Sequence, residues 1–305
     1  ALTVGLSFAP IYAKGLSVEW PDVLRWSQRV IDLADGDPSK GNLIFGSPLA
    51  LAFTQRGIGR YCLGRRGWRD DLQRALAMAR STDPLSYATV VCYVYLLGIP
   101  FGVLTPEDRA VREIEDALRI AERSGDDLAL AEARMALGIV LVHCHTDAEC
   151  DRGEKLLAEV SDVFVRREYL LCELPLVNVY LARERARRGD RDDAIRLLRA
   201  AVDHLFGEGR LVLWGVPATG VLVETLLDRA AESDVAEAEA AIERLAVAPA
   251  DEGLVIRDIW LLRLCVLLAR AKGDETGYYD YRDRYRDMAR TLGFKGHIAW
   301  AEAMS

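Results

Sequence analysis

The sequence predicts an all-α fold, a right-handed α-solenoid of about seven helix-turn-helix repeats. Helix-forming residues dominate the composition, and aromatic residues make up only 8%. No alternating run bounded by hairpin turns indicates a β-strand. Breaks between helices recur with a period of about 41 residues, and such regular spacing is typical of helical repeats. These breaks fall at Gly67, Thr105, Asp147, Gly189, Ser233 and Gly273.

The residues at these breaks are typical of helix starts. Ser233 is a capping residue followed by Asp234, in the first turn, where the helix dipole favours negative charge. Thr105 is expected to cap the next helix, with Pro106 at its first position. We therefore expect a mostly apolar helix before each break and an amphipathic helix after it.

We expect one superhelical domain over residues 1–305. In this division residues 1–45 form an irregular N-terminal helix pair, 46–292 the repeats and 293–305 a C-terminal cap. The opening ALTVGLSFAPIYA lacks a basic region and is interpreted as a first helix, not a signal peptide. The first pair departs most from the repeat, so we interpret it as the place where an upstream domain docks.

Two segments carry the small and large residues of a known repeat at the right spacing. In RRGDRDDAIRLLRAAVD they are Gly189, Ala194, Leu198 and Ala201. In TPEDRAVREIEDALRIAE they are Ala110, Ile114 and Ala117. Both segments resemble the tetratricopeptide repeat, although the period exceeds the 34 residues of its standard form. The longer helices resemble the tetratricopeptide-like solenoids of large bacterial signalling ATPases.

The tail RDMARTLGFKGHIAWAEAM (286–304) resembles the C-terminal end of actinobacterial multidomain regulators. In that family an adenylate/guanylate cyclase or LuxR-type module is joined to an AAA/STAND ATPase and then to helical repeats. The resemblance implies a sensor or scaffold region that regulates an attached ATPase, cyclase or transcription-factor module. No Walker A loop, cyclase aspartate pair or recognition helix is visible, so that catalysis is not assigned to this chain.

Charge and cysteine usage restrict the classes of partner. The formal net charge of −8 argues against a broad nucleic-acid or anionic-membrane surface. The six cysteines contain no CxxC pair and lie mostly in apolar runs, as expected of a reduced, cytoplasmic protein. Residues 85–106 carry no charge, but Gly98, Pro100 and Gly102 interrupt them, which favours a buried helix over a membrane span.

The acidic run GDRDD raises the question of a cation site. An EF-hand loop spreads its ligands over twelve residues and ends in a bidentate glutamate. Here Asp190, Asp192 and Asp193 lead into an apolar run without one. Helix capping and the helix dipole explain these aspartates better.

The segment VHCHTDAEC gives the alternative function, a metal-dependent enzyme such as a hydrolase. His143, His145 and Cys150 are zinc-type ligands, with Cys144, Asp147 and Glu149 nearby. Yet the two histidines point to different faces of a helix, and no closed set of four ligands follows. We therefore expect no metal or other cofactor here, and a histidine-rich helix end instead.

No other segment indicates catalysis or base stacking. Phosphate-loop, nucleophile-elbow, HExxH and dinucleotide-binding motifs are absent, so no nucleophile or base stands out. The tyrosine-rich segment 277–293 places Tyr278, Tyr281, Tyr285 and Met288 on one helical stripe. The other side carries Asp280 with Arg284, and Asp283 with Asp287 or Arg286. That pattern favours a packing face over nucleic-acid binding.

Counting back from each break predicts a partner groove lined by the first helix of each pair. Seven arginines there would suit a protein or peptide partner, an acidic one especially, or a small anionic ligand, because the guanidinium binds carboxylates and phosphates bidentately. The predicted lining is Phe53, Arg56, Arg60, Tyr95, Arg183, Arg187, Arg229, Trp260, Arg263 and Arg270. We expect a non-catalytic interaction or ligand-sensing scaffold.

Overall fold

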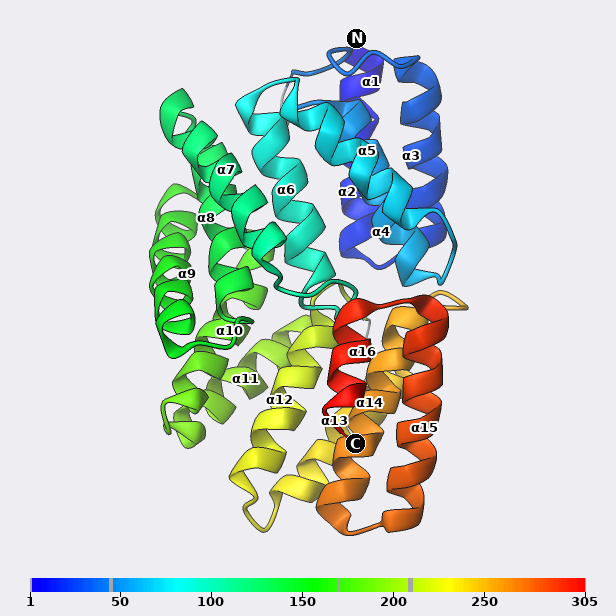
Figure 1. Ribbon diagram of the computed structural model, residues 1–305, viewed down its shortest axis with the longest axis vertical. Helices are drawn as coiled ribbons and strands as arrows, with labels where there is room; N and C mark the ends of the chain where they lie inside the picture. The colour runs from blue at the N-terminus through cyan, green and yellow to red at the C-terminus, as the bar shows by residue number, and fades with distance from the viewer. Residues whose placement is uncertain (1, 44–45, 169, 208–210, 305) are drawn as a thin grey trace. The chain divides into compact units, whose positions relative to one another are not determined.

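The computed structural model describes residues 2–43, 46–168, 170–207 and 211–304. All regular structure in these ranges is helical (Figure 1). The contacts divide the chain into two compact units. Unit 1 comprises Ala1–Pro100 and Thr105–Tyr169, and unit 2 comprises Phe101–Leu104 and Leu170–Ser305. The predicted single superhelical domain therefore stays a prediction.

Unit 1 consists of consecutive helices that pack as pairs. Its helices are α1 (Leu2–Leu6), α2 (Phe8–Leu16), α3 (Trp20–Ala34), α4 (Pro48–Cys62), α5 (Trp68–Arg80), α6 (Pro84–Gly98), α7 (Asp108–Ser124), α8 (Asp127–Leu141) and α9 (Asp147–Arg167). The pairs are α2/α3, α4/α5, α6/α7 and α8/α9, and each first helix also packs on the first helix of the next pair. This is the neighbour-on-neighbour packing of a helical repeat.

Unit 2 repeats the same arrangement. Its elements are η1 (Leu171–Glu173), α10 (Leu174–Arg187), α11 (Arg191–Leu205), α12 (Gly215–Arg229), α13 (Asp234–Val247), α14 (Val255–Lys272), α15 (Glu275–Leu292) and α16 (Lys295–Glu302). The pairs are α10/α11, α12/α13 and α14/α15, and α16 packs on α15. In Figure 1, α16 lies along α14 and α15, as a terminal helix.

The predicted breaks lie in or beside the turns between paired helices. Gly189 adopts φ +100°, and the Asp190 side chain accepts a hydrogen bond from the Asp193 backbone N–H at 3.4 Å. The GDRDD run is thus a capped elbow. The expected cap at Thr105 is wrong, because α7 begins only at Asp108. At Ser233 the side chain makes no capping hydrogen bond.

Burial follows the predicted alternation between the two helices of a pair. Every residue of α6 from Ser86 to Gly98 is buried, whereas its partner α7 buries only Ala110, Ile114, Ala117 and Ala121. No helix in the described ranges has both the length and the apolar character needed to span a membrane. Small residues permit close approach: a Cβ on Gly153 of α9 would lie 2.9 Å from the Gly138 carbonyl oxygen of α8.

Candidate functional site

In unit 1, two arginines of the predicted groove bind one buried carboxylate. Arg56 Nη2 and Arg60 Nη1, both on α4, lie 2.6 Å from the two Asp71 carboxylate oxygens. Asp71 lies in the first turn of α5 and its side chain is 5% exposed. The ion pairs therefore join the end of the first helix of a pair to the start of the second.

Unit 2 uses the same chemistry at its elbows. Arg229 at the end of α12 binds Asp234, in the first turn of α13, at 2.5 Å, and Asp192 of α11 at 2.6 Å. The hydrogen bond from Arg229 lowers the pKa of the fully buried Asp234 carboxyl. Arg185 binds Asp193 in the same way across the α10–α11 elbow. Thus an acid in the first turn of the second helix meets an arginine near the end of the first.

The other predicted groove residues differ in exposure. Phe53, Tyr95 and Trp260 are 2%, 7% and 3% exposed and belong to the core. Two of the arginines form ion pairs, Arg187 with Glu184 and Arg263 with Glu224. Arg183 lies over the Tyr180 ring. Arg270 lines a pocket together with Tyr278 and Tyr279. Phe53, Arg56, Arg60 and Tyr95 lie in unit 1 and the others in unit 2. A common groove stays a prediction.

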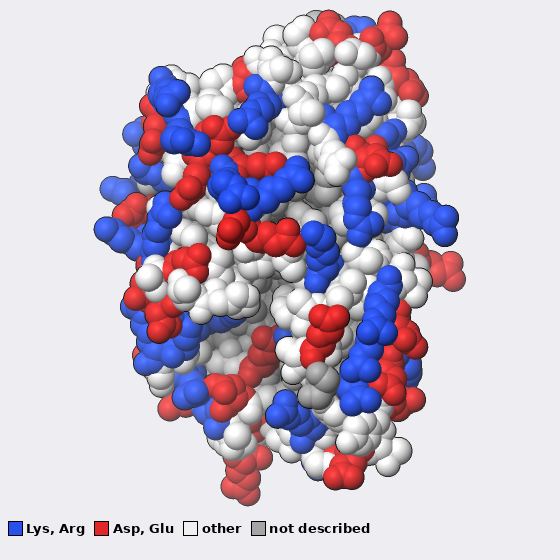
Figure 2. All heavy atoms as spheres, in the orientation of Figure 1, with Lys and Arg blue, Asp and Glu red and all other residues white. Residues whose placement is uncertain are grey.

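Surface charge is mixed on the face shown in Figure 2, where basic and acidic side chains alternate and no broad basic field forms. The tyrosine-rich helix α15 fits the predicted packing stripe in part. Tyr285 is fully buried, and Asp280–Arg284 and Asp283–Arg286 are ion pairs at 3.1 and 3.8 Å. Tyr278 donates a hydrogen bond to the Met304 carbonyl oxygen at 2.5 Å, a structural use of its hydroxyl.

The VHCHTDAEC segment forms a helix junction. His143 Nδ1 lies 2.7 Å from the Ile139 carbonyl oxygen, while Cys150 is buried and His145 is exposed. Thr146 and Glu149 form a reciprocal capping box at the start of α9. Burial raises the pKa of Cys144 to about 11, which keeps it a thiol at neutral pH. Across the described ranges, no three His, Cys, Asp or Glu side chains are grouped as metal ligands.

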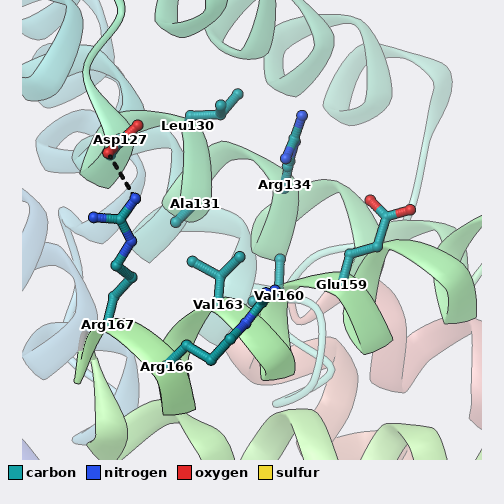
Figure 3. A pocket seen from close by; sticks show the side chains of 9 residues that line it. All are labelled: Asp127, Leu130, Ala131, Arg134, Glu159, Val160, Val163, Arg166 and Arg167. Carbon is teal, nitrogen blue, oxygen red and sulfur yellow. Dashed lines mark ion pairs between the residues drawn. The ribbon is translucent and has the colours of Figure 1, made fainter.

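A pocket of about 290 Å³ lies between α8 and α9 in unit 1 (Figure 3). Leu130 and Ala131 of α8 and Val160 and Val163 of α9 supply its apolar lining. Its polar lining is Asp127, Arg134, Glu159, Arg166 and Arg167. The lining comes from the first half of α8 and the second half of α9, so the pocket is built from two helices rather than from loops.

The charges of this pocket are only partly paired. Figure 3 shows the Asp127–Arg167 ion pair, 3.9 Å long, at one side and Arg134 and Glu159 at the other. Arg166 donates to the Asp162 carbonyl oxygen at 3.1 Å. Within the described ranges neither Arg134 nor Arg166 forms an ion pair with a carboxylate. Two guanidinium groups beside an apolar lining can receive a carboxylate from another molecule.

None of the pocket residues belongs to the predicted groove set. Arg134 nevertheless leaves a signal in the sequence, because it interrupts the apolar helix DLALAEARMALGIVL. The position of Arg166 has no such signal, since arginines are common in the exposed second helices.

Comparison with known proteins gives a fold but no family. No protein-family model and no curated protein sequence matches the chain. The crystal structure of a Rap protein complexed with competence and sporulation factor is similar, with a TM-score of 0.65 and 12% identity, over 99% of this chain and 80% of that chain. Yeast Tom70 gives a TM-score of 0.47 and 16% identity over 99% of this chain, which spans 63% of the Tom70 chain. The likeness to the Rap structure confirms the predicted fold class, an α-solenoid of tetratricopeptide-like repeats.

Proposed function

We propose that this chain is a non-catalytic scaffold of a bacterial regulatory protein that binds a protein or peptide partner. The α8–α9 pocket carries the proposal, because it combines an apolar lining with two arginines that form no ion pair with a carboxylate among the described residues. The structurally similar Rap protein was crystallised with competence and sporulation factor, which supports a binding role for such repeats.

The pocket volume of about 290 Å³ lies at the lower end of the range for small-molecule pockets, about 300–1,000 Å³. One or two side chains of a partner would fill such a volume. An apolar side chain next to a carboxylate matches its chemistry, because the apolar lining takes the first and Arg134 with Arg166 takes the second.

The regulatory part of the proposal rests on the family resemblance of residues 286–304. In such a protein, partner binding would shift the packing of the repeats and bias an upstream ATPase, cyclase or transcription-factor module. The complete reading frame tests this part. An ATPase, cyclase or transcription-factor module encoded upstream in the same frame supports the proposal, and a frame that encodes none of these modules rejects it.

The binding part is tested with peptides selected by phage display on the purified chain. Val163→Trp places a large ring in the pocket, and we expect it to weaken binding of the selected peptides at least tenfold. Val247→Trp is the matched control, since Val247 is 71% exposed on α13, in unit 2. Selection of no peptide, or equal loss in both variants, rejects the pocket as the binding site.

The predicted groove needs its own test. Arg56→Glu, Arg60→Glu and Arg263→Glu are compared with the wild-type chain for binding of the same peptides, after circular dichroism has shown that each variant is folded. Unchanged binding in all three rejects the groove. Loss of binding in these variants, with normal binding by Val163→Trp, moves the site from the pocket to the groove.

A further inference from the structure

A four-residue segment of unit 2, Phe101–Leu104, is held by helices far away in sequence. We call this segment the strap. It follows α6 and precedes α7, yet its contacts place it in unit 2. Phe101 and Val103 are buried, at 2% and 0% exposure. The residues that bind it are as many as 196 positions away along the chain.

Three consecutive backbone carbonyls of the strap accept hydrogen bonds from α14 and α16. The Phe101 oxygen accepts from Trp260 Nε1 at 3.3 Å and from His297 Nε2 at 3.0 Å. The backbone N–H groups of His297 and Lys295 donate to Gly102 and Val103 at 2.9 and 3.1 Å. These two N–H groups belong to the first turn of α16, where a helix has no internal acceptors.

Two hydrogen bonds orient the side chain of His297, one to the strap and one to Tyr285. A carbonyl oxygen only accepts, so Nε2 carries the proton and Nδ1 accepts from the Tyr285 hydroxyl at 2.8 Å. The imidazole is fully buried and lies edge-on to the rings of Trp260 and Trp300. Removal of the strap would leave its N–H buried without an acceptor.

The contact also requires a glycine at position 102 of the strap. Gly102 adopts φ +70°, and a Cβ there would lie 2.8 Å from the His297 ring. Across from it, a Cβ on Gly296 would lie 2.7 Å from the Gly102 carbonyl oxygen. The ring of Phe101 packs on Trp214 with centroids 6.2 Å apart. Main-chain hydrogen bonds combined with side-chain pockets are the usual means of peptide recognition.

We propose that α14 and α16 form a recognition site for a short apolar turn with a central glycine, and that the strap is its intramolecular occupant. The ligand class is a peptide of the type Phe-Gly-Val, bound through its carbonyls. A partner segment of this chemistry would compete with the strap for the same donors. The proposal is independent of the α8–α9 pocket.

The test supplies the strap as a separate peptide. Phe101→Ala empties the aromatic part of the site in the full chain, and a synthetic peptide of residues 99–107 is then added in excess. We expect the peptide to raise the Tm of this variant by about 2 °C or more, because a ligand that binds only the folded state stabilises it. The wild-type chain, whose site is filled, should show no shift. The control peptide carries alanine in place of Gly102.

If Phe101→Ala does not fold, Val103→Ala replaces it, since this smaller truncation empties the buried Val103 part of the site and weakens the strap in competition with the added peptide. The proposal is overturned if the peptide shifts neither variant, if it shifts the wild-type chain equally, or if the alanine-containing peptide acts as well as the native one.

Discussion

The α8–α9 pocket of unit 1 and the strap site of unit 2 use polar groups in opposite ways. The pocket is open, and Arg134 and Arg166 on its rim have no carboxylate partner in the described ranges. The strap site is closed, and each of its buried donors, from Trp260 Nε1 to the Lys295 N–H, has an acceptor. A solvent-accessible arginine keeps its binding capacity for another molecule, whereas a buried donor satisfied by the strap stabilises the fold for as long as the strap occupies the site.

The same contrast separates the arginines from one another. Arg56 and Arg60 neutralise Asp71 inside an elbow. Arg134 also lies on the first helix of its pair, but in its first half, which faces the second half of α9. Among the described residues no elbow carboxylate lies opposite that position, so Arg134 is not part of an elbow ion pair.

The largest expected effect lies in the strap site. Gly102→Ala adds a Cβ that collides with His297 at a positive φ, and we expect a loss of about 3 kcal/mol or more in the free energy of unfolding. Gly273→Ala is the matched control, because Gly273 also has φ +70° but has no atom within 4 Å of an added Cβ. Its cost should be about 1 kcal/mol. Urea unfolding measures both, and equal losses would contradict the steric account.

The next effect compares a buried with an exposed carboxylate in unit 1. Asp71→Ala leaves two guanidinium groups without their acid, and we expect a loss of about 3 kcal/mol. Asp127→Ala removes the pocket-rim pair, whose side chains are 66% and 64% exposed, and should cost at most about 0.5 kcal/mol. Thermal or urea unfolding compares the two, and a reversed order would reject the structural role of the elbow.

The strap site should also make the free energy of unfolding depend on pH, a smaller effect. Burial, and then the nearby Arg263 charge, lower the pKa of His297 well below its ordinary value. The unfolded chain binds a proton below pH about 6.5 while the folded chain does not, so stability should decrease as pH falls below that value. The slope approaches about 1.4 kcal/mol per pH unit, measured by urea unfolding from pH 7.5 to 5.5. His297→Gln should flatten the slope, and an unchanged slope in this variant would contradict the assignment.

The smallest effect on stability belongs to the pocket. Arg134→Glu and Arg166→Glu break no ion pair in the described ranges, so each should change the free energy of unfolding by about 0.5 kcal/mol or less. The same variants should nevertheless lose binding of acidic peptides selected on the wild-type chain. Differential scanning fluorimetry and peptide anisotropy give the two readouts. A large loss of stability would make these arginines structural, like Arg56.

Much of the fold was predictable because it depends on local chemistry. The helix breaks are set by residues such as Gly189 and Asp190, whose conformational and capping preferences act over a few positions. The apolar first helices, such as α6, are visible as long uncharged runs. The cap expected at Thr105 was wrong because a proline after a threonine usually indicates a helix start. Here the chain runs from the strap, Phe101–Leu104, through Thr105 to Glu107 before α7 begins.

The functional site was less predictable. The sequence alone determined the helical repeat, the positions of its elbows and the excess of arginine near them, since these depend on propensity and periodicity. Tertiary structure decided which arginine meets an acid, because Arg60 and Asp71 become neighbours only when α4 packs on α5. It also decided the strap site, where His297 meets Phe101 across 196 positions of the chain. No local pattern encodes a hydrogen bond between residues so far apart, because their proximity results from the packing of every helix between them.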